Sequence, residues 1–243
     1  MSTPGKIYGV GVGPGDPELM TLKAARILAA APVLAHFRKR GQPGYARGIV
    51  EGFLHPECRE LALDYPLTTE VSREDAGYKA ALTSFYDGVA GELEAIAGSG
   101  QDVAVVCEGD PFFYGSFMHV YQRLASRHRV EVVPGITGMS ACWTRSGKPI
   151  TYGDDVLTVL PGTLALEALI ERMRVADALV VIKLGRNFAK VRRALTTAGL
   201  AERAVYVERG SMAGELIVPL NQKLDDDAPY FSMILVPGRG RCL

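Results

Sequence analysis

An apolar run followed by a turn of small and acidic residues is the stretch best suited to chemistry. The run 103–107 (VAVVC) has no polar face, which predicts a strand covered on both sides, as in a parallel sheet. Gly109, Asp110 and Pro111 follow it, offering close backbone approach, a short carboxylate acceptor and an end to the strand. Ligands of open α/β sheets bind beyond the carboxyl ends of strands, where this turn would lie. An ordinary Asp-Pro turn before a helix explains the same residues, so spacing alone leaves both interpretations open.

A second candidate for ligand binding is the glycine-rich segment that follows a strand predicted at 6–12. Its glycines at 9, 11, 13 and 15 do not match G-x-G-x-x-G in any register, and no acidic residue lies near 33–36 for a ribose. A Walker A motif is excluded as well, because Gly147-Lys148 precedes a proline. A loop of backbone N–H groups shaped for another ligand is the alternative to a plain strand-to-helix turn.

Other reactive side chains show no recognisable catalytic or metal-binding spacing. No metal site is predicted, and we expect each histidine to be a surface or capping residue; they are His36, His55, His119 and His128. Cys107 has no base evident in the sequence. Tyr114 could assist a proton transfer or simply pack. The basic residues 38–40 stand in a loop predicted at 37–44 and could pair with substrate carboxylates or form a solvated face.

Composition narrows the class of protein. Among 243 residues, 48% are hydrophobic and 22% charged, which is a normal globular balance. Twenty-seven basic residues balance 27 acidic ones, and a zero net charge argues against nucleic-acid binding. The sequence shows no signal peptide and no apolar run long enough to span a membrane. Four scattered cysteines indicate reduced thiols, so we expect a cytoplasmic protein.

The periodicity predicts an α/β protein of two domains, 1–150 and 151–243. In the first domain, strands alternate with helices, one of them capped by Thr21, which predicts a mostly parallel sheet. These strands are expected at 6–12, 33–36, 59–63, 103–107 and 130–133, and the helices after the first one at 45–54, 74–96 and 117–127. A further helix is expected to start at the PGIT turn (134–137) and to be broken by Gly147 and Pro149. The second domain is expected to end in antiparallel strands, because little room is left there for helices. Its strands are expected at 156–160, 178–184, 204–208, 216–220 and 230–236, and its helices at 164–173 and 188–198.

Six segments, taken in order, resemble the motifs of the tetrapyrrole methylases, which use S-adenosylmethionine. They are VGVGPGDPELMT (10–21), CEGDPFFYGS (107–116), VEVVPGITGMSA (130–141), VVIKLGRNFAKV (180–191), YVERGSMAGE (206–215) and YFSMILVPGRG (230–240). The resemblance covers nearly the whole chain. Within the family, DYPLT (64–68), Ile182-Lys183 and VERGSM (207–212) are most similar to the members that methylate C20 of precorrin-2 in cobalamin synthesis.

The resemblance implies a homodimer that holds S-adenosylmethionine in a cleft between its two domains and releases S-adenosylhomocysteine. By motif position, the cofactor contacts would be Gly109, Asp110, Thr137, Gly138, Leu184, Met212 and Met233. The loop of Gly13, Pro14, Gly15 and Asp16 would face precorrin-2. Arg38 and Arg40 could hold the carboxylates of this substrate, and Arg145 and Arg186 are further candidates. Several relatives have a second glycine where this chain has Glu108. A carboxylate turned inward there would repel the carboxylate of the cofactor.

The implied reaction explains why no base is evident. The methyl group is a good electrophile and a meso carbon of a reduced tetrapyrrole is electron-rich, so alignment and exclusion of water can supply most of the catalysis. The product would be precorrin-3A. One alternative is methylation of a related substrate, either cobalt-precorrin-2 or another precorrin or uroporphyrinogen. A second is a ribosomal RNA methylase, which the zero net charge disfavours. A third is an inactive scaffold that binds the nucleoside.

Overall fold

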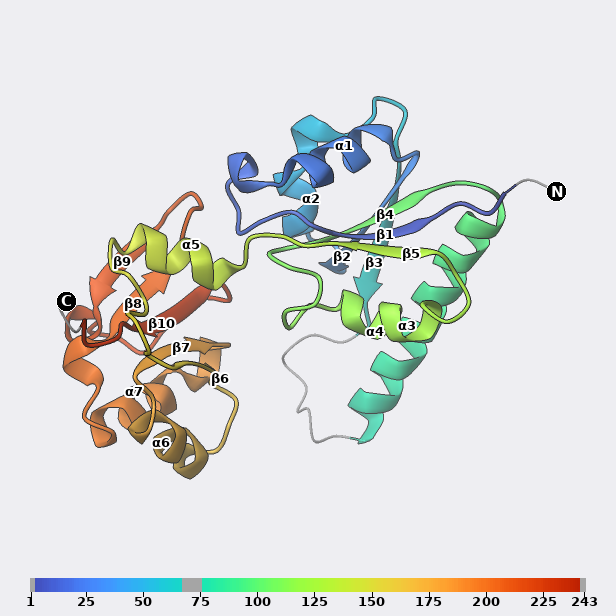
Figure 1. The fold of residues 1–243 in the computed structure, drawn as a ribbon. Helices are drawn as coiled ribbons and strands as arrows, with labels where there is room; N and C mark the ends of the chain where they lie inside the picture. Colours follow the sequence, from blue (N-terminus) through green and yellow to red (C-terminus); the bar gives the residue numbers. More distant parts are fainter. Residues whose placement is uncertain (1–2, 67–75, 241–243) are drawn as a thin grey trace. The chain divides into compact units, whose positions relative to one another are not determined.

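The computed structural model describes residues 3–66 and 76–240 (Figure 1). Two compact units make up the chain, Met1–Thr137 and Gly138–Leu243. Each is built around its own five-stranded sheet, which confirms the predicted α/β class. The division falls ahead of the boundary expected at 150, because the helix after the PGIT turn belongs to the second unit. Four predicted features lie partly or wholly outside the described residues. They are a polar connector expected at 65–73, the start of the helix predicted from 74, the last two residues of DYPLT, and Cys242.

The first unit holds a sheet whose strands are all parallel, in the order β3-β2-β4-β1-β5. Its strands are β1 (Ile7–Gly11), β2 (Val33–Lys39), β3 (Arg59–Tyr65), β4 (Val103–Cys107) and β5 (Val130–Val133). Its helices are α1 (Leu22–Ala30), α2 (Tyr45–Ile49), α3 (Ala76–Gly98) and α4 (Phe117–Leu124), with short 3-10 turns at Pro17–Leu19 and Glu51–Phe53. The parallel sheet was predicted, and the structure confirms it.

Strand β4 lies at the centre of this sheet and is buried on both faces, as its composition predicted. Val103, Val105 and Cys107 pack in the core on the side of α3 and α4. Ala104 and Val106 pack on the opposite side, with α1 and α2 (Figure 1). Each buried valine contributes about 1.5–3 kcal/mol relative to an exposed one, so this strand fixes the middle of the unit.

The connections out of β1 and β4 leave the sheet on opposite faces. After β1 the chain runs through α1 to β2, and after β4 it runs through α4 to β5 on the other face (Figure 1). Neighbouring strands whose connections diverge in this way mark the point at which open α/β sheets bind ligands. The glycine-rich turn after β1 and the GDP turn after β4 therefore lie at the edge where a site is expected.

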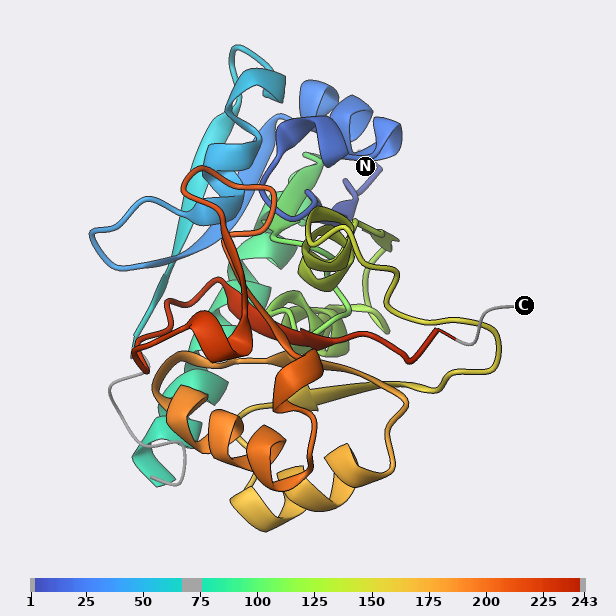
Figure 2. The ribbon, with the colours of Figure 1, turned by 90° about the vertical axis from the view of Figure 1, so that its left-hand side faces the viewer.

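The second unit has a mixed sheet in the order β6-β7-β10-β8-β9. Strand β10 pairs antiparallel with β7 and β8, which confirms the predicted antiparallel end of the chain. Its elements are α5 (Gly138–Arg145), β6 (Leu157–Pro161), α6 (Leu166–Arg174), β7 (Ala178–Ile182), α7 (Phe188–Thr197), β8 (Val205–Glu208), β9 (Leu216–Pro219) and β10 (Ser232–Val236), with 3-10 turns at Gly185–Asn187, Ala201–Arg203 and Leu220–Gln222. Helices α6 and α7 cover one face of the sheet, and α5 packs on the other (Figure 2).

Two expectations for the first unit were wrong. Residues 37–39 were assigned to a loop, yet they continue β2, because they pair in register with 63–65 of β3. His36 was expected at the surface, but it is 4% exposed and faces Gly44; a Cβ added at Gly44 would lie 2.6 Å from His36 Nδ1.

Within the described parts of the chain, no helix is long and apolar enough to cross a membrane. Three cysteines there, Cys58, Cys107 and Cys142, are free thiols.

Candidate functional site

The end of β1 and the loops that follow β4 and β5 meet backbone against backbone at three glycines. A Cβ on Gly135 would lie 2.1 Å from the carbonyl oxygen of Gly109, and one on Gly11 would lie 2.6 Å from the nitrogen of Gly135. Gly109 has φ 67° and donates its N–H to the Gly13 carbonyl at 2.8 Å. We call Gly11, Gly109 and Gly135 the glycine junction. It leaves no room for a side chain and brings the three strand ends together.

Asp110 ties the GDP turn to the PGIT turn. Its Oδ1 accepts from the Phe112 N–H at 2.8 Å, and its Oδ2 accepts from the Gly135 N–H at 3.1 Å. The first bond is the Asp-Pro turn considered above, and the second reaches the loop that carries Thr137. Asp110 therefore positions Gly109 on one side and the PGIT turn on the other.

Glu108, whose orientation the sequence left open, is bound by α2. Its Oε1 accepts from the backbone N–H of Ala46 at 2.9 Å. That N–H belongs to the first turn of α2, and the residue before the helix is Gly44, which has no side chain to cap it. The carboxylate thus serves as a distant cap and joins α2 to the end of β4.

Some of the residues expected to contact the substrate already have hydrogen-bond partners within the protein. Asp16 caps a 3-10 turn by accepting from the Glu18 N–H at 2.9 Å, and the adjoining Gly13 has φ 81°. Arg38 donates to Asp64 at 2.7 Å across β2 and β3, and this bond raises the pKa of Arg38. Arg40 is exposed. The structure thus gives Asp16 and Arg38 structural partners that the sequence did not reveal.

A chain of three hydroxyl groups lies where α4 begins, and the sequence analysis missed it. Ser116 Oγ is hydrogen-bonded to Tyr65 Oη and accepts from Tyr86 Oη at 3.2 Å. Burial raises the pKa of Tyr86, so this group stays protonated. Tyr65 also stacks on Phe37, with ring centroids 5.6 Å apart. Ser116 stands in the CEGDPFFYGS motif and Tyr65 in DYPLT, which was the only signal in the sequence.

Backbone strain is concentrated beyond the carboxyl ends of three strands. Tyr114 follows β4 with φ 57° and is 45% exposed. Lys183 follows β7 with φ 58°, while Arg209 and Ser211 follow β8 with φ 49° and 66°. Strands β7 and β8 both run antiparallel to β10, so they end at the same edge of their sheet. Left-handed backbone at residues other than glycine is uncommon and tends to occur at functional sites.

The expected cofactor contacts of the second unit differ in which of their atoms are available to a ligand. Leu184 is 0% exposed and packs in the core, so only its backbone can face a ligand. Gly138 and Met233 are neighbours, because a Cβ on Gly138 would lie 3.6 Å from the Met233 methyl carbon. The Met212 N–H closes a turn on the Arg209 carbonyl at 2.8 Å.

The two further arginine candidates of the second unit also differ. Arg145 is bound by both carboxylate oxygens of Glu215, with Nε and Nη2 donating at 2.8–3.0 Å. Arg186 is exposed, in the 3-10 turn after β7. Both side chains are exposed, and Arg145 has a structural partner in Glu215.

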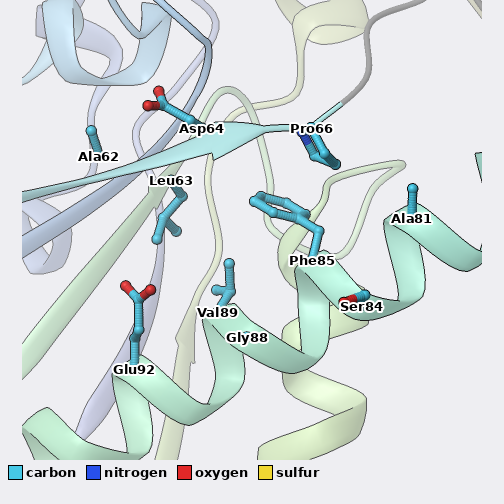
Figure 3. A pocket seen from close by; sticks show the side chains of 10 residues that line it. All are labelled: Ala62, Leu63, Asp64, Pro66, Ala81, Ser84, Phe85, Gly88, Val89 and Glu92. Atoms are coloured by element: carbon cyan, nitrogen blue, oxygen red, sulfur yellow. The ribbon is translucent and has the colours of Figure 1, made fainter.

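A cavity of about 550 Å³ lies between β3 and α3, away from the glycine junction. Figure 3 shows Phe85 and Val89 rising from α3 toward Leu63 of β3. Among the described lining residues the charged ones are both acidic, Asp64, which is paired with Arg38, and Glu92, so they offer no cation to a ligand. A ligand rich in carboxylates is therefore a poor match for this cavity.

Comparison with known proteins identifies the chain's relatives. Residues 6–224 match the family model described as Tetrapyrrole (Corrin/Porphyrin) Methylases. A precorrin-2 C(20)-methyltransferase from Sinorhizobium sp is 52% identical over 96% of both chains. A cobalt-precorrin-2 C(20)-methyltransferase from Salmonella typhimurium is 28% identical over 96% of both chains.

Solved structures agree in fold. Cobalt precorrin-4 methyltransferase, a cobalamin biosynthetic enzyme, superposes with TM-score 0.73 at 22% identity, covering 96% of this chain and 94% of that one. Uroporphyrin-III C-methyltransferase from Thermus thermophilus, solved with S-adenosyl homocysteine, superposes with TM-score 0.67 at 25% identity, covering 95% and 92%.

Proposed function

The chain belongs to the tetrapyrrole (corrin/porphyrin) methylases, and from this membership we propose that it transfers a methyl group from S-adenosylmethionine to C20 of precorrin-2. The product is precorrin-3A, an intermediate of cobalamin synthesis. The observation that carries the proposal is the 52% identity with the Sinorhizobium precorrin-2 C(20)-methyltransferase over 96% of both chains. The match extends over nearly the full length of both sequences.

The same carbon of cobalt-precorrin-2 is the second candidate. It is favoured by the Salmonella relative, which is named for the cobalt-bearing substrate and matches the same share of the chain. Its identity of 28% is about half that of the Sinorhizobium protein, so we place the metal-free substrate first.

Two features support a nucleoside cofactor in this chain. Ser211 Oγ is buried, and among the described residues no partner satisfies it, which a ligand hydrogen bond would correct. The bare backbone of Gly138 beside Met233 offers a flat apolar contact of the kind that a nucleobase needs. The Thermus relative, whose structure contains S-adenosyl homocysteine, is consistent with this assignment.

We assign the cofactor contacts separately in each unit. In the first unit they are Gly109, Asp110 and Thr137, which the glycine junction and the Asp110–Gly135 bond hold together. In the second unit they are Gly138, the backbone of Leu184, Met212 and Met233. The substrate is assigned to the loop of residues 13–16 and to Arg40, with Arg38 held by Asp64.

The protein's contribution to the reaction is mainly geometric. S-adenosylmethionine supplies an electrophilic methyl group when it is bound, and the substrate supplies an electron-rich carbon. Orientation of two reactants and exclusion of water can lower a barrier by up to about 7–11 kcal/mol, so the rigid junction of Gly11, Gly109 and Gly135 has a direct catalytic use. Tyr114 is the candidate for assisting the departing C20 proton, because its left-handed backbone holds the ring in an exposed position.

One experiment tests the activity and separates the two substrates. The protein is incubated with methyl-labelled S-adenosylmethionine and either precorrin-2 or cobalt-precorrin-2, and the product is examined by NMR. We expect label at C20 and faster turnover of the metal-free compound. Label at another carbon, or none, would refute the proposal, and faster turnover of the cobalt compound would select the second candidate.

Two variants test the assigned residues. Asp110→Ala removes both Asp110 bonds, so we expect S-adenosylhomocysteine to bind tens of times more weakly by calorimetry. Tyr114→Phe keeps the ring and removes the hydroxyl. We expect a lower kcat with unchanged S-adenosylhomocysteine affinity, and an unchanged kcat would assign Tyr114 to packing alone.

We also propose that the protein is a cytoplasmic homodimer. Light scattering during size-exclusion chromatography tests the assembly, with a mass near twice 26.2 kDa as the expected result.

A further inference from the structure

The turn that follows β8 is held in a strained conformation. Arg209 and Ser211 both adopt left-handed backbone, with Gly210 between them. Each such residue costs about 1–2 kcal/mol, so neighbouring contacts must enforce the conformation. Two backbone hydrogen bonds contribute, from the Arg209 N–H to the Phe231 carbonyl and from the Met212 N–H to the Arg209 carbonyl, both at 2.8 Å. We call residues 209–212 the β8 turn.

Helix α5 lies directly against the β8 turn. A Cβ on Gly210 would lie 2.7 Å from Cys142 Sγ and 3.3 Å from Cys142 Cα, so the turn's backbone packs on the helix. Arg145 stands three residues further along α5, on the same side as Cys142. The helix therefore presents a packing surface and a cation to the same turn.

A single carboxylate joins the helix to the turn. Glu215 Oε2 accepts from the Ser211 N–H at 2.8 Å and from Arg145 Nε at 2.9 Å, and Oε1 accepts from Arg145 Nη2 at 2.8 Å. The Glu215 side chain is 18% exposed and that of Arg145 57%. The bond from Arg145 lowers the pKa of Glu215, and the Ser211 N–H contributes to this shift. Glu215 thus remains an ionised acceptor under ordinary conditions.

We propose that Glu215, oriented by Arg145, is a positioning residue that holds the β8 turn in the conformation required to bind the nucleoside cofactor. The inference rests on the proposed function, because Met212 and the hydroxyl of Ser211 are the groups that it places. Without Glu215 the Ser211 N–H loses its acceptor, and the strained turn relaxes. The ion pair alone is a surface feature of small energetic value, so its main effect is on the geometry of the turn.

Calorimetry with S-adenosylhomocysteine is the primary test, applied to E215A, E215Q and R145A. We expect E215A to weaken binding about tenfold or more, since a hydrogen bond to a charged acceptor is lost and the turn is released. E215Q keeps one oxygen acceptor and should lie between E215A and the wild type. The matched control is D87N, which breaks the Arg123–Asp87 ion pair of the first unit, with a nitrogen-to-oxygen distance of 2.6 Å, and should bind as the wild type does.

A charge swap distinguishes positioning from simple cross-linking. R145E/E215R restores an ion pair between α5 and residue 215, which precedes β9, but places a donor opposite the Ser211 N–H. We expect it to keep the wild-type midpoint of thermal unfolding but not the wild-type affinity for S-adenosylhomocysteine. Retention of both would show that the ion pair, and not the bond to the turn, is what matters, and would overturn the proposal.

Hydrogen exchange of the unliganded protein supplies a readout independent of the cofactor. The Ser211 amide should exchange at least about tenfold faster in E215A than in the wild type or D87N, because its acceptor is gone. Unchanged exchange, or unchanged affinity in E215A, would refute the positioning role. If the wild type fails to bind S-adenosylhomocysteine, the proposed cofactor is wrong, and the exchange result still decides whether Glu215 holds the turn.

Discussion

Replacing Gly135 by alanine tests whether the glycine junction is as rigid as its geometry indicates. Gly135 is outside the left-handed region, so alanine is compatible with its backbone and only the added methyl group matters. That carbon would lie 2.1 Å from the Gly109 oxygen and 2.9 Å from Gly11 Cα. Both obstacles are backbone atoms, one at the end of β1 and one in the loop after β4, so they cannot rotate away as a side chain would.

The expected cost follows from this immobility. Overpacking of a core typically costs about 1–3 kcal/mol, and backbone obstacles place Gly135→Ala at the upper end, at about 3 kcal/mol. The midpoint of thermal unfolding should fall by about 6–12 °C. Gly91→Ala is the matched control. Gly91 is exposed in the middle of α3 with nothing within 4 Å of an added Cβ, so the same change should stabilise by about 0.5–1 kcal/mol.

Urea denaturation followed by circular dichroism measures both effects. Trp143 is the single tryptophan and belongs to α5 of the second unit, so its fluorescence reports that unit separately. We expect Gly135→Ala to shift the circular dichroism transition much more than the fluorescence transition. It should also weaken S-adenosylhomocysteine binding, because the Asp110–Gly135 bond is displaced. A wild-type unfolding midpoint for Gly135→Ala, with Gly91→Ala stabilised, would show that the three loops separate easily and would refute the argument.

Three further outcomes can be checked on the same protein. Burial lowers the pKa of His36 below its ordinary value of 6.5, so its contribution to stability is present above pH 6.5 and is lost as the pH falls through the lowered pKa. The urea midpoint of His36→Asn should therefore depend less on pH between 7.5 and 5 than the wild-type midpoint does. Gly9→Ala should destabilise, because the new Cβ would lie 2.1 Å from the Phe117 ring, and Phe117→Leu in the same chain should recover part of the loss in thermal unfolding. Burial raises the pKa of Cys142 to about 12, so its thiol stays protonated and unreactive at pH 8. When the folded protein is alkylated at pH 8, mass spectrometry should find half-exposed Cys58 modified and Cys142 unmodified.

Much of the fold could be predicted because its core strands are unambiguous. The run 103–107 has no polar face, and it is the buried centre of the first sheet. Thr21 was expected to cap a helix, and its hydroxyl accepts from the Ala24 N–H at 3.1 Å. In both places the local pattern and the tertiary environment demand the same residue types, which is the condition under which sequence patterns are reliable.

The errors arose where tertiary pairing overrides local composition. Arg38 and Lys39 resemble a solvated loop, yet they extend an inner strand because Asp64 of the neighbouring strand neutralises Arg38. Leu184 stays a predicted cofactor contact, and because the structure turns its side chain into the core, that contact is expected from its backbone. A motif specifies which backbone passes a site; it does not specify which way a side chain points.

The distribution of strain supports a site built from backbone geometry. Four residues other than glycine have left-handed backbone, and each follows the carboxyl end of β4, β7 or β8 within the described chain. One of them, Tyr114, lies seven positions beyond β4, and Lys183 directly follows β7. Chance placement would scatter such residues over turns at both ends of the strands. Their restriction to one edge in each unit implies that the free-energy cost of the strained backbone is retained because that edge binds a ligand. A reaction that depends on alignment more than on a reactive side chain requires such a rigid binding edge.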